Sequence, residues 1–418
     1  MNALKITVIG GGSTYTPELI EGFIRYYDEL PVAQITLMDI SEDRLKVVGD
    51  LVQRMLGDLP VKLVRTTDRR EAITGADFVV TQLRVGGLAA RALDEQLPMQ
   101  HGVLGQETTG PGGFAKALRT IPVMLDIARD IERFAPDAWL INFTNPAGLV
   151  VEALNRLTHV KVIGLCNVPI NMQMRVAEKL QVSPQEVELR YMGLNHLSWA
   201  RALVNGRDVT DEALKLAWAG GNLDDEYLKT VGLIPNYYIR YFAHPDRVLR
   251  EQLTAEETRA EYLQGVEAEL LELYKDPELK EKPKLLETRG GAYYSTAAVN
   301  LIRAIAQDRR EVHIVNVPNQ HSINDLPEGA VVEVPAVIGK SGAQPLMQGG
   351  LPPAIRGLVV SVKAYEELTV EAAVTGDESI AKLALFTHPL VPSWDVATAL
   401  WNDIKTAHAA YLPNFTGK

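Results

Sequence analysis

The sequence predicts an α/β protein: a Rossmann-like, doubly wound parallel sheet in the N-terminal part and an α+β domain in the C-terminal part. Three observations favour this class. Short β-branched runs alternate with amphipathic segments up to about residue 165, a glycine cluster follows the first run, and half-exposed strand patterns mix with longer helices thereafter. We therefore expect domains at residues 1–165 and 166–418, with no obvious linker between them.

The first domain alternates strands and helices in chain order. Residues 4–9 form a β-branched run that stops at three glycines, so they are expected to be a buried strand. Residues 17–27 are expected to be a helix with Thr16 as its N-cap, because Pro17 suits the first helical turn. Further strands are predicted at 35–39, 78–83, 139–143 and 160–165, and further helices at 42–56 and 113–133. Right-handed crossovers would join these strands into one parallel sheet.

The second domain shows a different pattern. Antiparallel strands are predicted at residues 187–191 and 200–204, and two more strands at 312–317 and 331–337. Helices are predicted at 228–242, 255–274, 358–375 and 396–411, with a charged, proline-bounded loop at 277–283. This domain is expected to bind substrate and metal and to mediate oligomerisation. The two domains are expected to pack against each other through a shared interface.

Charge and cysteine content exclude several classes of protein. The 418 residues carry a net charge of −11, which disfavours nucleic acids and membrane surfaces as partners, since both are anionic. The single cysteine cannot form an internal disulfide, and no targeting or membrane-spanning segment is recognisable. A reduced, cytoplasmic protein is therefore expected.

The glycine cluster suggests a dinucleotide site. Gly10 and Gly12 follow the first predicted strand and precede the first helix, where a tight turn lets backbone amides approach a pyrophosphate. The third glycine of the usual fingerprint is replaced by Tyr15. Asp39, after the second strand, is suited to the adenosine ribose and would repel a 2′-phosphate, which favours NAD over NADP. The alternative is an ordinary glycine turn with Asp39 capping the next helix.

Polar residues also gather in loops after other predicted strands. In an open α/β sheet, ligands bind beyond the carboxyl ends of strands, so Asn145 is expected to face the cleft. Cys166 and His196 each follow a predicted strand, and a thiolate with an imidazole can bind a transition metal. By residue type alone, a small core cysteine and a structural histidine are the stronger alternative.

A tyrosine cluster supplies a candidate base. Tyr238 and Tyr241 are predicted to share a helical face, with Tyr237 beside them. An aromatic face of this kind is most often part of the core. A tyrosine near a metal cation, however, could have a lowered pKa and act as a base.

Arginines beside glycine pairs are candidates for binding phosphate. Arg84 and Arg91 flank Val85–Gly87, and Arg289 precedes a Gly-Gly pair followed by hydroxyl residues. For each arginine taken alone, an ordinary surface ion pair is the more common explanation.

Taken together, these motifs resemble the NAD-dependent glycoside hydrolases of family 4, specifically their 6-phospho-β-glucosidase branch. The resemblance extends over essentially the whole chain. It is carried by IGGGSTYTPEL (9–19), QLRVGG (82–87), GQETTGPGG (105–113), FTNPAG (143–148), GLCNVP (164–169), GLNHLSW (193–199), the tyrosine segment (234–241) and RGGAYYSTAA (289–298). It implies a lactate/malate-dehydrogenase-like fold, bound NAD, a divalent metal that is usually manganese, and a homodimer or homotetramer.

The resemblance also assigns residues. It implies that Cys166 and His196 are metal ligands and that Tyr238 is the base. Because Tyr237 is the adjacent residue, the motif can also be aligned with Tyr237 as the base. Asn167 follows the cysteine as in the phospho-β-glucosidase branch and is assigned to catalysis and substrate binding. The remaining assignments are Gly10, Gly12, Ser13, Thr14, Asp39 and Asn145 for the cofactor, and Arg91, Asn145 and Arg289 for the substrate.

The implied reaction is hydrolysis of a 6-phospho-β-glucoside, such as phosphorylated cellobiose or an aryl glucoside, to glucose 6-phosphate and the aglycone. NAD oxidises C3, the metal polarises the ketone, Tyr238 removes the C2 proton, the aglycone is eliminated, water adds, and NADH returns the hydride. One alternative is a malate- or lactate-type 2-hydroxy-acid dehydrogenase, although His196 lies in Asn-His-Leu rather than Gly-His-Gly. Another is a nucleotide-binding regulator without turnover.

Overall fold

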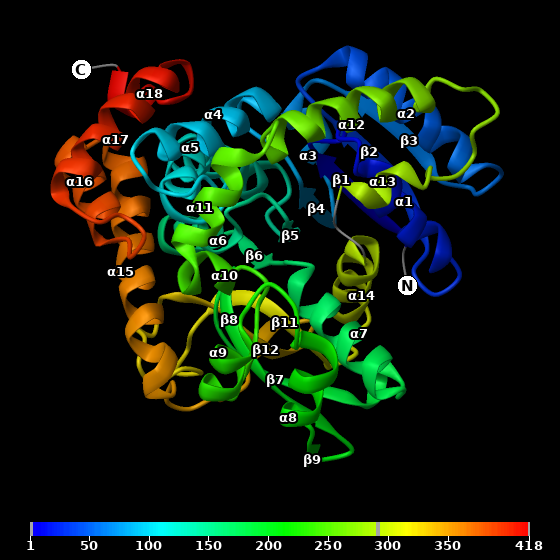
Figure 1. Cartoon of the computed structure of the whole chain (residues 1–418). Helices are drawn as coiled ribbons and strands as arrows, with labels where there is room; N and C mark the ends of the chain where they lie inside the picture. The colour runs from blue at the N-terminus through cyan, green and yellow to red at the C-terminus, as the bar shows by residue number, and fades with distance from the viewer. Residues whose placement is uncertain (1–2, 290–292, 417–418) are drawn as a thin grey trace.

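A nine-stranded sheet forms the centre of the molecule (Figure 1). The computed structural model describes residues 3–289 and 293–416. The strand order is β13-β12-β11-β6-β5-β4-β1-β2-β3. The six N-terminal strands are parallel: β1 (Leu4–Ile9), β2 (Val32–Met38), β3 (Lys62–Thr66), β4 (Phe78–Thr81), β5 (Trp139–Asn142) and β6 (Lys161–Gly164). The predicted doubly wound parallel sheet is thus confirmed.

The same sheet continues into the C-terminal half of the chain. β11 (Glu311–Pro318) pairs antiparallel with β6 and with β12 (Val331–Gly339), which in turn pairs with β13 (Gly342–Pro345). The large sheet therefore contains strands from before and after residue 165. Backbone hydrogen bonds join the two predicted domains, in addition to the expected packing interface.

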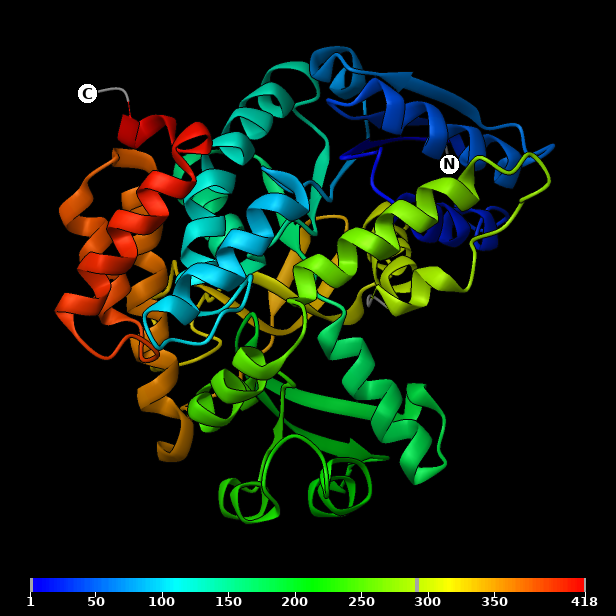
Figure 2. The ribbon, with the colours of Figure 1, turned by 45° about the horizontal axis from the view of Figure 1, so that its top comes forward.

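Helices pack around this sheet in two groups. The first contains α1 (Thr16–Arg25), α2 (Glu42–Leu56), α12 (Arg259–Tyr274) and α14 (Tyr294–Ala306). The second contains α3 (Arg69–Ile73), α4 (Gly87–Gln100), α5 (Gly110–Phe134), α6 (Ala147–Leu157), α15 (Pro353–Thr375), α16 (Glu378–Thr387) and α17 (Trp394–Ala407). The C-terminal helices lie against α5 and α4, at the opposite end from β3 (Figure 2).

A smaller antiparallel sheet lies below the large one in Figure 1. It contains β7 (Val187–Leu194), β8 (Leu197–Val204), β9 (Arg207–Asp208) and β10 (Ile234–Pro235). β7 and β8 form the predicted hairpin, and its turn is the two-residue segment Asn195–His196. β7 packs against β12 of the large sheet, which anchors the hairpin to the core.

The remaining short helices connect these elements. They are α7 (Val168–Leu180), α8 (Thr210–Ala213), α9 (Asp225–Val231), α10 (Ile239–Ala243), α11 (Pro245–Thr254), α13 (Leu285–Thr288) and α18 (Pro413–Thr416). Among the described residues, no helix combines the length and apolar character needed to cross a membrane.

Two local predictions were wrong. Residues 228–242 are not one helix, because Gly232 adopts a left-handed conformation that ends α9, and Ile234–Pro235 then pair with β8. Thr16 is the first residue of α1 rather than its N-cap, and its hydroxyl donates to the Gly11 carbonyl at 2.9 Å. Proline at the start of the helix was correctly expected.

Candidate active site

Cys166 and His196 meet at the carboxyl edge of the large sheet. Cys166 lies between β6 and α7, and His196 lies in the β7–β8 turn with a left-handed φ of 65°. The Cys166 Sγ and His196 Nε2 atoms are 3.6 Å apart. Metal–nitrogen and metal–sulfur bonds of about 2.0–2.3 Å would span that separation, so the donor pair fits a shared cation.

The tautomer of His196 follows from its neighbour Thr108. The Thr108 hydroxyl donates to Gln106 Oε1 at 2.9 Å, so it must accept the hydrogen on His196 Nδ1, which is 2.8 Å away. Nε2 then carries the lone pair that faces Cys166. Burial lowers the pKa of His196 to about 3, which keeps the imidazole neutral, as a metal ligand requires.

Cys166 sits where amides converge. The backbone amide of Val168, in the first turn of α7, reaches Sγ at 3.5 Å, and the Asn167 amide and Asn195 side chain also hydrogen-bond the thiol. These donors favour a thiolate, but burial and the nearby Glu333 carboxylate raise the thiol pKa above its ordinary value. A bound cation would supply the positive charge that deprotonation needs.

Tyr238 completes this cluster. Its ring stacks on that of His196, with centroids 3.9 Å apart and planes 5° apart, and lies 5.8 Å from the Tyr241 ring. Tyr237 is 51% exposed and points instead toward Arg240, whose guanidinium donates to its hydroxyl at 3.3 Å. Of the two adjacent tyrosines, Tyr238 is therefore the one beside the candidate cation ligands.

The protein groups alone do not lower the pKa of Tyr238. Burial raises its pKa well above the ordinary value, the Cys166 and Glu107 charges act in the same direction, and Arg91 opposes them. Among the protein's own groups, desolvation of the phenolate outweighs the nearby guanidinium, and the lowering expected beside a metal cation stays a prediction.

A charged cluster around Glu107, which the sequence did not single out, adjoins His196 and Tyr238. The Glu107 carboxylate forms ion pairs with Arg84, with Arg91 at 2.8 Å and with Lys116 at 2.7 Å. These cations hold its pKa well below the ordinary range, and burial lowers the pKa of Lys116 to about 7. Arg91 also pairs with Glu95 at 2.7 Å, so this candidate for phosphate binding already has two carboxylate partners.

The glycine loop has the close packing of a nucleotide cradle. Gly10 has a φ of 86°, which favours glycine, and its amide donates to the Met38 carbonyl at 2.9 Å. The Gly12 amide donates to the Asp39 carboxylate at 3.0 Å, and a Cβ on Gly12 would lie 2.9–3.0 Å from the Arg44 and Asp39 side chains. Asp39 is thus held against the loop and also accepts from the Ser41 amide at 3.1 Å, and its role in ribose binding stays a prediction.

The second candidate for phosphate binding, Arg289, lies at this loop. It donates to the Thr14 hydroxyl, pairs with Glu267 of α12 at 3.3 Å and stacks over the Tyr15 ring at 4.8 Å. The described contacts link Arg289 to the nucleotide loop rather than to Cys166 or His196. Residues 290–292 of the motif that follows it lie outside the described residues.

The remaining predicted site residues follow strands of the large sheet. Asn145 lies between β5 and α6, and the next residue, Pro146, lines a small cavity of about 20 Å³ with Asn195 and His196. Asn167 precedes α7, and its carbonyl accepts from the Asn171 amide at 3.0 Å. Ser13 accepts a hydrogen bond from the Tyr15 amide at 3.2 Å, within the glycine loop.

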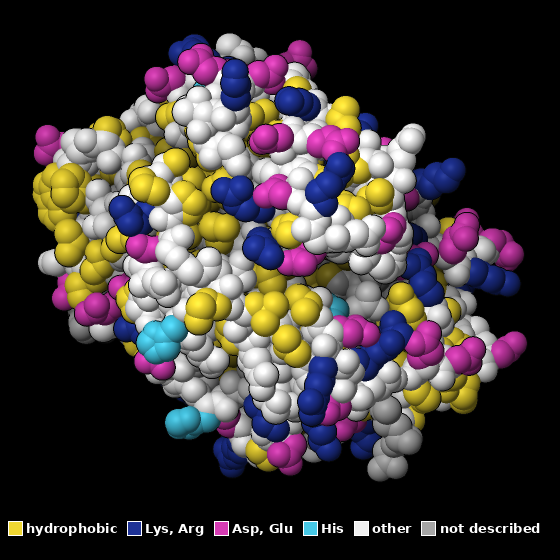
Figure 3. All heavy atoms as spheres, turned by 90° about the horizontal axis from the view of Figure 1, so that it is seen from below, with side chains coloured by type: hydrophobic (Ala, Val, Ile, Leu, Met, Phe, Trp, Pro, Cys, Tyr) yellow, Lys and Arg dark blue, Asp and Glu magenta, His cyan; other side chains and the backbone are white. Residues whose placement is uncertain are grey.

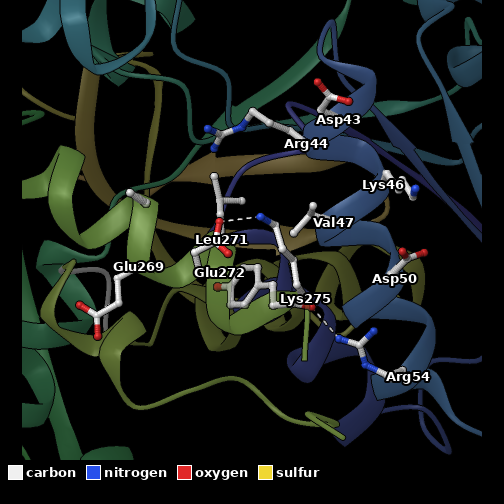
Figure 4. Close-up of a pocket in the computed structure, with 12 residues that line it drawn as sticks. Asp43, Arg44, Lys46, Val47, Asp50, Arg54, Glu269, Leu271, Glu272 and Lys275 are labelled. Atoms are coloured by element: carbon white, nitrogen blue, oxygen red, sulfur yellow. Dashed lines mark hydrogen bonds and ion pairs between the residues drawn. The ribbon is translucent and has the colours of Figure 1, made fainter. Parts of the chain in front are cut away.

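A larger hollow lies elsewhere. A groove of about 840 Å³ separates α2 from α12 and is lined by Lys46, Arg54, Glu269 and Lys275 among others (Figure 4). It borders the nucleotide loop through Arg44, which donates to the Gly12 carbonyl at 3.0 Å. Its mixed charges indicate no single ligand class, so donor chemistry rather than cavity size locates the candidate active site.

A buried polar network beneath the site was also missed from the sequence. Glu333 of β12 accepts hydrogen bonds from Tyr191, Asn195 and Asn316. The only signal in the sequence is an acid within the otherwise apolar run VVEVPAV at 331–337. Such a residue needs buried partners, but the sequence does not reveal which ones.

Comparisons with known proteins agree with this geometry. The family described as "Family 4 glycosyl hydrolase" matches residues 5–182, and its C-terminal domain matches residues 191–391. A probable 6-phospho-beta-glucosidase of Bacillus subtilis is 48% identical over 99% of this chain and 98% of that protein. The structure of the Thermotoga maritima 6-phospho-beta glucosidase with manganese, NAD+ and glucose-6-phosphate matches with a TM-score of 0.92 and 36% identity, covering 98% of this chain and 99% of that one.

A more distant likeness concerns the fold alone. Malate dehydrogenase from Aeropyrum pernix matches with a TM-score of 0.53 and 16% identity, over 88% of this chain and 97% of that one. The large sheet is therefore of the dehydrogenase type, as predicted.

Proposed function

Because this chain belongs to family 4 of the glycosyl hydrolases, we propose that it hydrolyses 6-phospho-β-glucosides to glucose 6-phosphate and an aglycone. It is a glycosidase that uses NAD and a divalent metal, and we propose manganese because a matched relative was solved with manganese and NAD+. The observation that carries the proposal is the Cys166–His196 pair with Tyr238 stacked on it, in a chain matched along its length to 6-phospho-β-glucosidases.

Cys166 and His196 would hold the cation. When bound, the cation would polarise oxygens on the sugar as a Lewis acid, and NAD would accept and return a hydride. The fixed tautomer of His196 and the amides around Cys166 Sγ prepare both donors for that cation. Two protein ligands leave coordination positions open for substrate oxygens.

Tyr238 is proposed to remove the C2 proton. Its raised pKa makes the phenol a poor base in the protein alone, so a nearby cation together with Arg91 is needed to stabilise the phenolate. Its stacking on His196 ties the position of the base to that of the cation ligand. The base would therefore become active only when the cation site is filled.

The cofactor is proposed to lie along the glycine loop. Gly10, Gly12, Ser13 and Thr14 would bind the pyrophosphate through backbone amides and hydroxyls. Asp39, held by the Gly12 amide, would accept hydrogen bonds from the ribose. Asn145 is proposed to lie near the nicotinamide and the sugar hydroxyls.

Arginines are proposed to bind the sugar phosphate. Asn145 and Asn167 are proposed to bind the sugar. Arg84, Arg91 and Lys116 face the carboxylates of Glu95 and Glu107, so the cluster has one excess positive charge when Lys116, whose pKa is about 7, is protonated. That excess favours an anion despite the acidic chain as a whole. Arg289 is retained as the second candidate, although its described contacts are to Thr14, Tyr15 and Glu267.

The alternative is a 2-hydroxy-acid dehydrogenase, favoured only by the shared fold and nucleotide loop. A dehydrogenase histidine shuttles a proton, whereas His196 is buried with a pKa of about 3 and faces a thiol. These properties suit a metal ligand rather than a proton shuttle.

The broader setting of the enzyme is also proposed. Its substrate would be a phosphorylated disaccharide or aryl glucoside, with neither nucleic acid nor membrane as a partner. The reduced thiol at the cation site favours a cytoplasmic location. A homodimer or homotetramer is supported by exposed apolar side chains on the C-terminal helices, among them Leu383, Phe386 and Trp394. Figure 3 shows hydrophobic side chains gathered at its left edge, the side on which these helices lie in Figure 1.

A panel of 6-phosphoglycosides tests the proposed activity. Purified protein is assayed with and without NAD+, Mn²⁺ and a thiol reductant, and malate and lactate are included as dehydrogenase substrates. We expect cleavage of an aryl 6-phospho-β-glucoside that needs all three additions, without net accumulation of NADH. Steady NADH formation from malate or lactate with no glycoside cleavage would establish the dehydrogenase instead.

A further inference from the structure

Among the described residues, no cation forms an ion pair with Glu333, a buried carboxylate. Its side chain is fully buried on β12, and burial raises its pKa above the ordinary value although three hydrogen bonds act in the opposite direction. Other buried acids in the described part of the chain have ion-pair partners, as Asp94 has in Arg119 and Glu152 in Lys363. A buried charge of this kind is strongly destabilising unless a positive charge lies nearby.

Three hydrogen-bond donors contact the Glu333 carboxylate. Oε2 accepts from the Tyr191 hydroxyl at 2.9 Å, and Oε1 accepts from the side-chain amides of Asn195 and Asn316, each at 3.0 Å. Three donors directed at two oxygens are the arrangement that suits an ionised carboxylate.

One arm of this network leads to the cation ligands. Asn195 occupies the two-residue β7–β8 turn beside His196, and its side chain also hydrogen-bonds Cys166. Asn316 pairs in the sheet with Gly164, two residues before Cys166. The carboxylate therefore fixes both segments that carry the candidate ligands.

The other arm leads to the base. The Tyr191 hydroxyl accepts from Ser198 Oγ at 2.6 Å, and Ser198 Oγ accepts from Asn236 Nδ2 at 3.0 Å. The Asn236 Oδ1 atom then accepts the backbone amide of Tyr238 at 2.9 Å. A chain of buried hydrogen bonds thus connects Glu333 to the residue that stacks on His196.

We propose that Glu333 is a positioning residue for both halves of the site: it holds the Cys166 and His196 segments together, orients Tyr238, and offsets the charge of the bound cation. This inference rests on the proposed function. With His196 held by Thr108 as the neutral Nδ1–H tautomer, a Cys166 thiolate and an ionised Glu333 would together carry a charge of −2, which a divalent cation would cancel. The carboxylate would then have the positive partner that the protein itself does not provide.

Mn²⁺ affinity tests this role independently of turnover. Free Mn²⁺ is measured by electron paramagnetic resonance during titration of the full-length protein with NAD present. We expect Glu333→Gln, which keeps the shape and removes the charge, to weaken Mn²⁺ binding roughly 10- to 100-fold, as for other groups that orient metal ligands. Glu152→Gln is the matched control, because Glu152 is equally buried and also hydrogen-bonds β12 at Val331, and its Mn²⁺ affinity should stay within about twofold.

Two further variants separate the possible failures. Asn195→Ala, on the partly exposed turn, should also weaken Mn²⁺ binding. This variant replaces Glu333→Gln as the test if Glu333→Gln does not fold. Folding is judged by NAD binding and thermal unfolding. Cys166→Ala should abolish Mn²⁺ binding. If Cys166→Ala binds Mn²⁺ like the unaltered chain, the proposed cation site itself is wrong. If Cys166→Ala loses binding while Glu333→Gln and Asn195→Ala retain full affinity, the cation site stands and the role of Glu333 is overturned.

Discussion

At the scale of single residues, the candidate site is defined by hydrogen-bond direction. The Thr108 hydroxyl can donate only one hydrogen, and it donates that hydrogen to Gln106, so His196 Nδ1 must be the donor toward Thr108. His196 Nε2 is left as an acceptor opposite Cys166 Sγ. A loop threonine thus decides which nitrogen of a distant histidine can bind a cation.

The choice of Tyr238 over Tyr237 leads to a prediction at this scale. We expect Tyr238→Phe to abolish exchange of the substrate C2 hydrogen with solvent deuterium and to lower kcat about 10²- to 10⁴-fold, because the proton loses its acceptor. Tyr237→Phe is the control, since Tyr237 is half exposed and contacts Arg240 instead, and it should keep both rates within about twofold. The exchange is measured by NMR in D₂O with NAD⁺ and Mn²⁺. Exchange that persists in Tyr238→Phe would assign the base elsewhere.

Residue identity could be predicted from sequence more readily than residue environment. The order of motifs singled out Cys166, His196 and Tyr238, which the fold brings together. The pKa of Tyr238 could not be predicted, because its direction depends on how far the ring is buried and on charges from Cys166, Glu107 and Arg91. Arg289 could be recognised as unusual, but its contact with Thr14 arises between residues 275 positions apart.

At the scale of elements, periodicity predicted the strands better than the connecting helices. β1, β5 and β6 are short apolar runs that end at polar or glycine-rich loops, so their local sequence suffices. α4 was not predicted: it begins at the second of two successive left-handed glycines and buries charged residues such as Arg91 and Asp94. Its burial depends on tertiary ion pairs with Glu107 and Arg119 rather than on an apolar stripe.

The β1–α1 loop provides the prediction for this scale. A Cβ at Gly12 would lie 2.9–3.0 Å from Arg44 and Asp39, closer than ordinary contacts, so Gly12→Ala must displace one of them. Overpacking typically costs about 1–3 kcal/mol, and 1.4 kcal/mol is tenfold in affinity, so NAD binding should weaken roughly 5- to 100-fold. Isothermal titration calorimetry measures the change.

Gly265→Ala supplies the matched control for the loop. Gly265 lies within α12, where a Cβ would meet nothing within 4 Å, so NAD affinity should be unchanged. The helix should gain stability of up to about 1 kcal/mol, because alanine is the better helix former. Equal NAD affinity in Gly12→Ala and the unaltered chain would mean that the cofactor does not use this loop.

At the scale of the whole molecule, the two halves of the chain are interlocked. β11 and β12 extend the N-terminal sheet, and α15 packs on α5. The C-terminal end returns to the first half, where His408 Nε2 lies 3.2 Å from the buried Asp94 carboxylate and His101 Nε2 lies 2.7 Å from Asp403. The sequence suggested a boundary at 165 because the helix–strand alternation stops there, but alternation does not reveal which later strands join the first sheet.

Because the two halves interlock, a fragment of residues 1–165 tests whether the N-terminal domain can fold on its own. A fragment of residues 1–165 would expose the β6 edge that pairs with Asn316 and the apolar surface of α5 and α6 that α15 covers. We expect the full chain to unfold in one cooperative thermal transition, and the fragment to show no cooperative transition and no measurable NAD binding. Circular dichroism and calorimetry make both measurements. An isolated fragment that binds NAD and unfolds cooperatively would instead show that residues 1–165 form an autonomous domain, with β11–β13 adding to a sheet already stable without them.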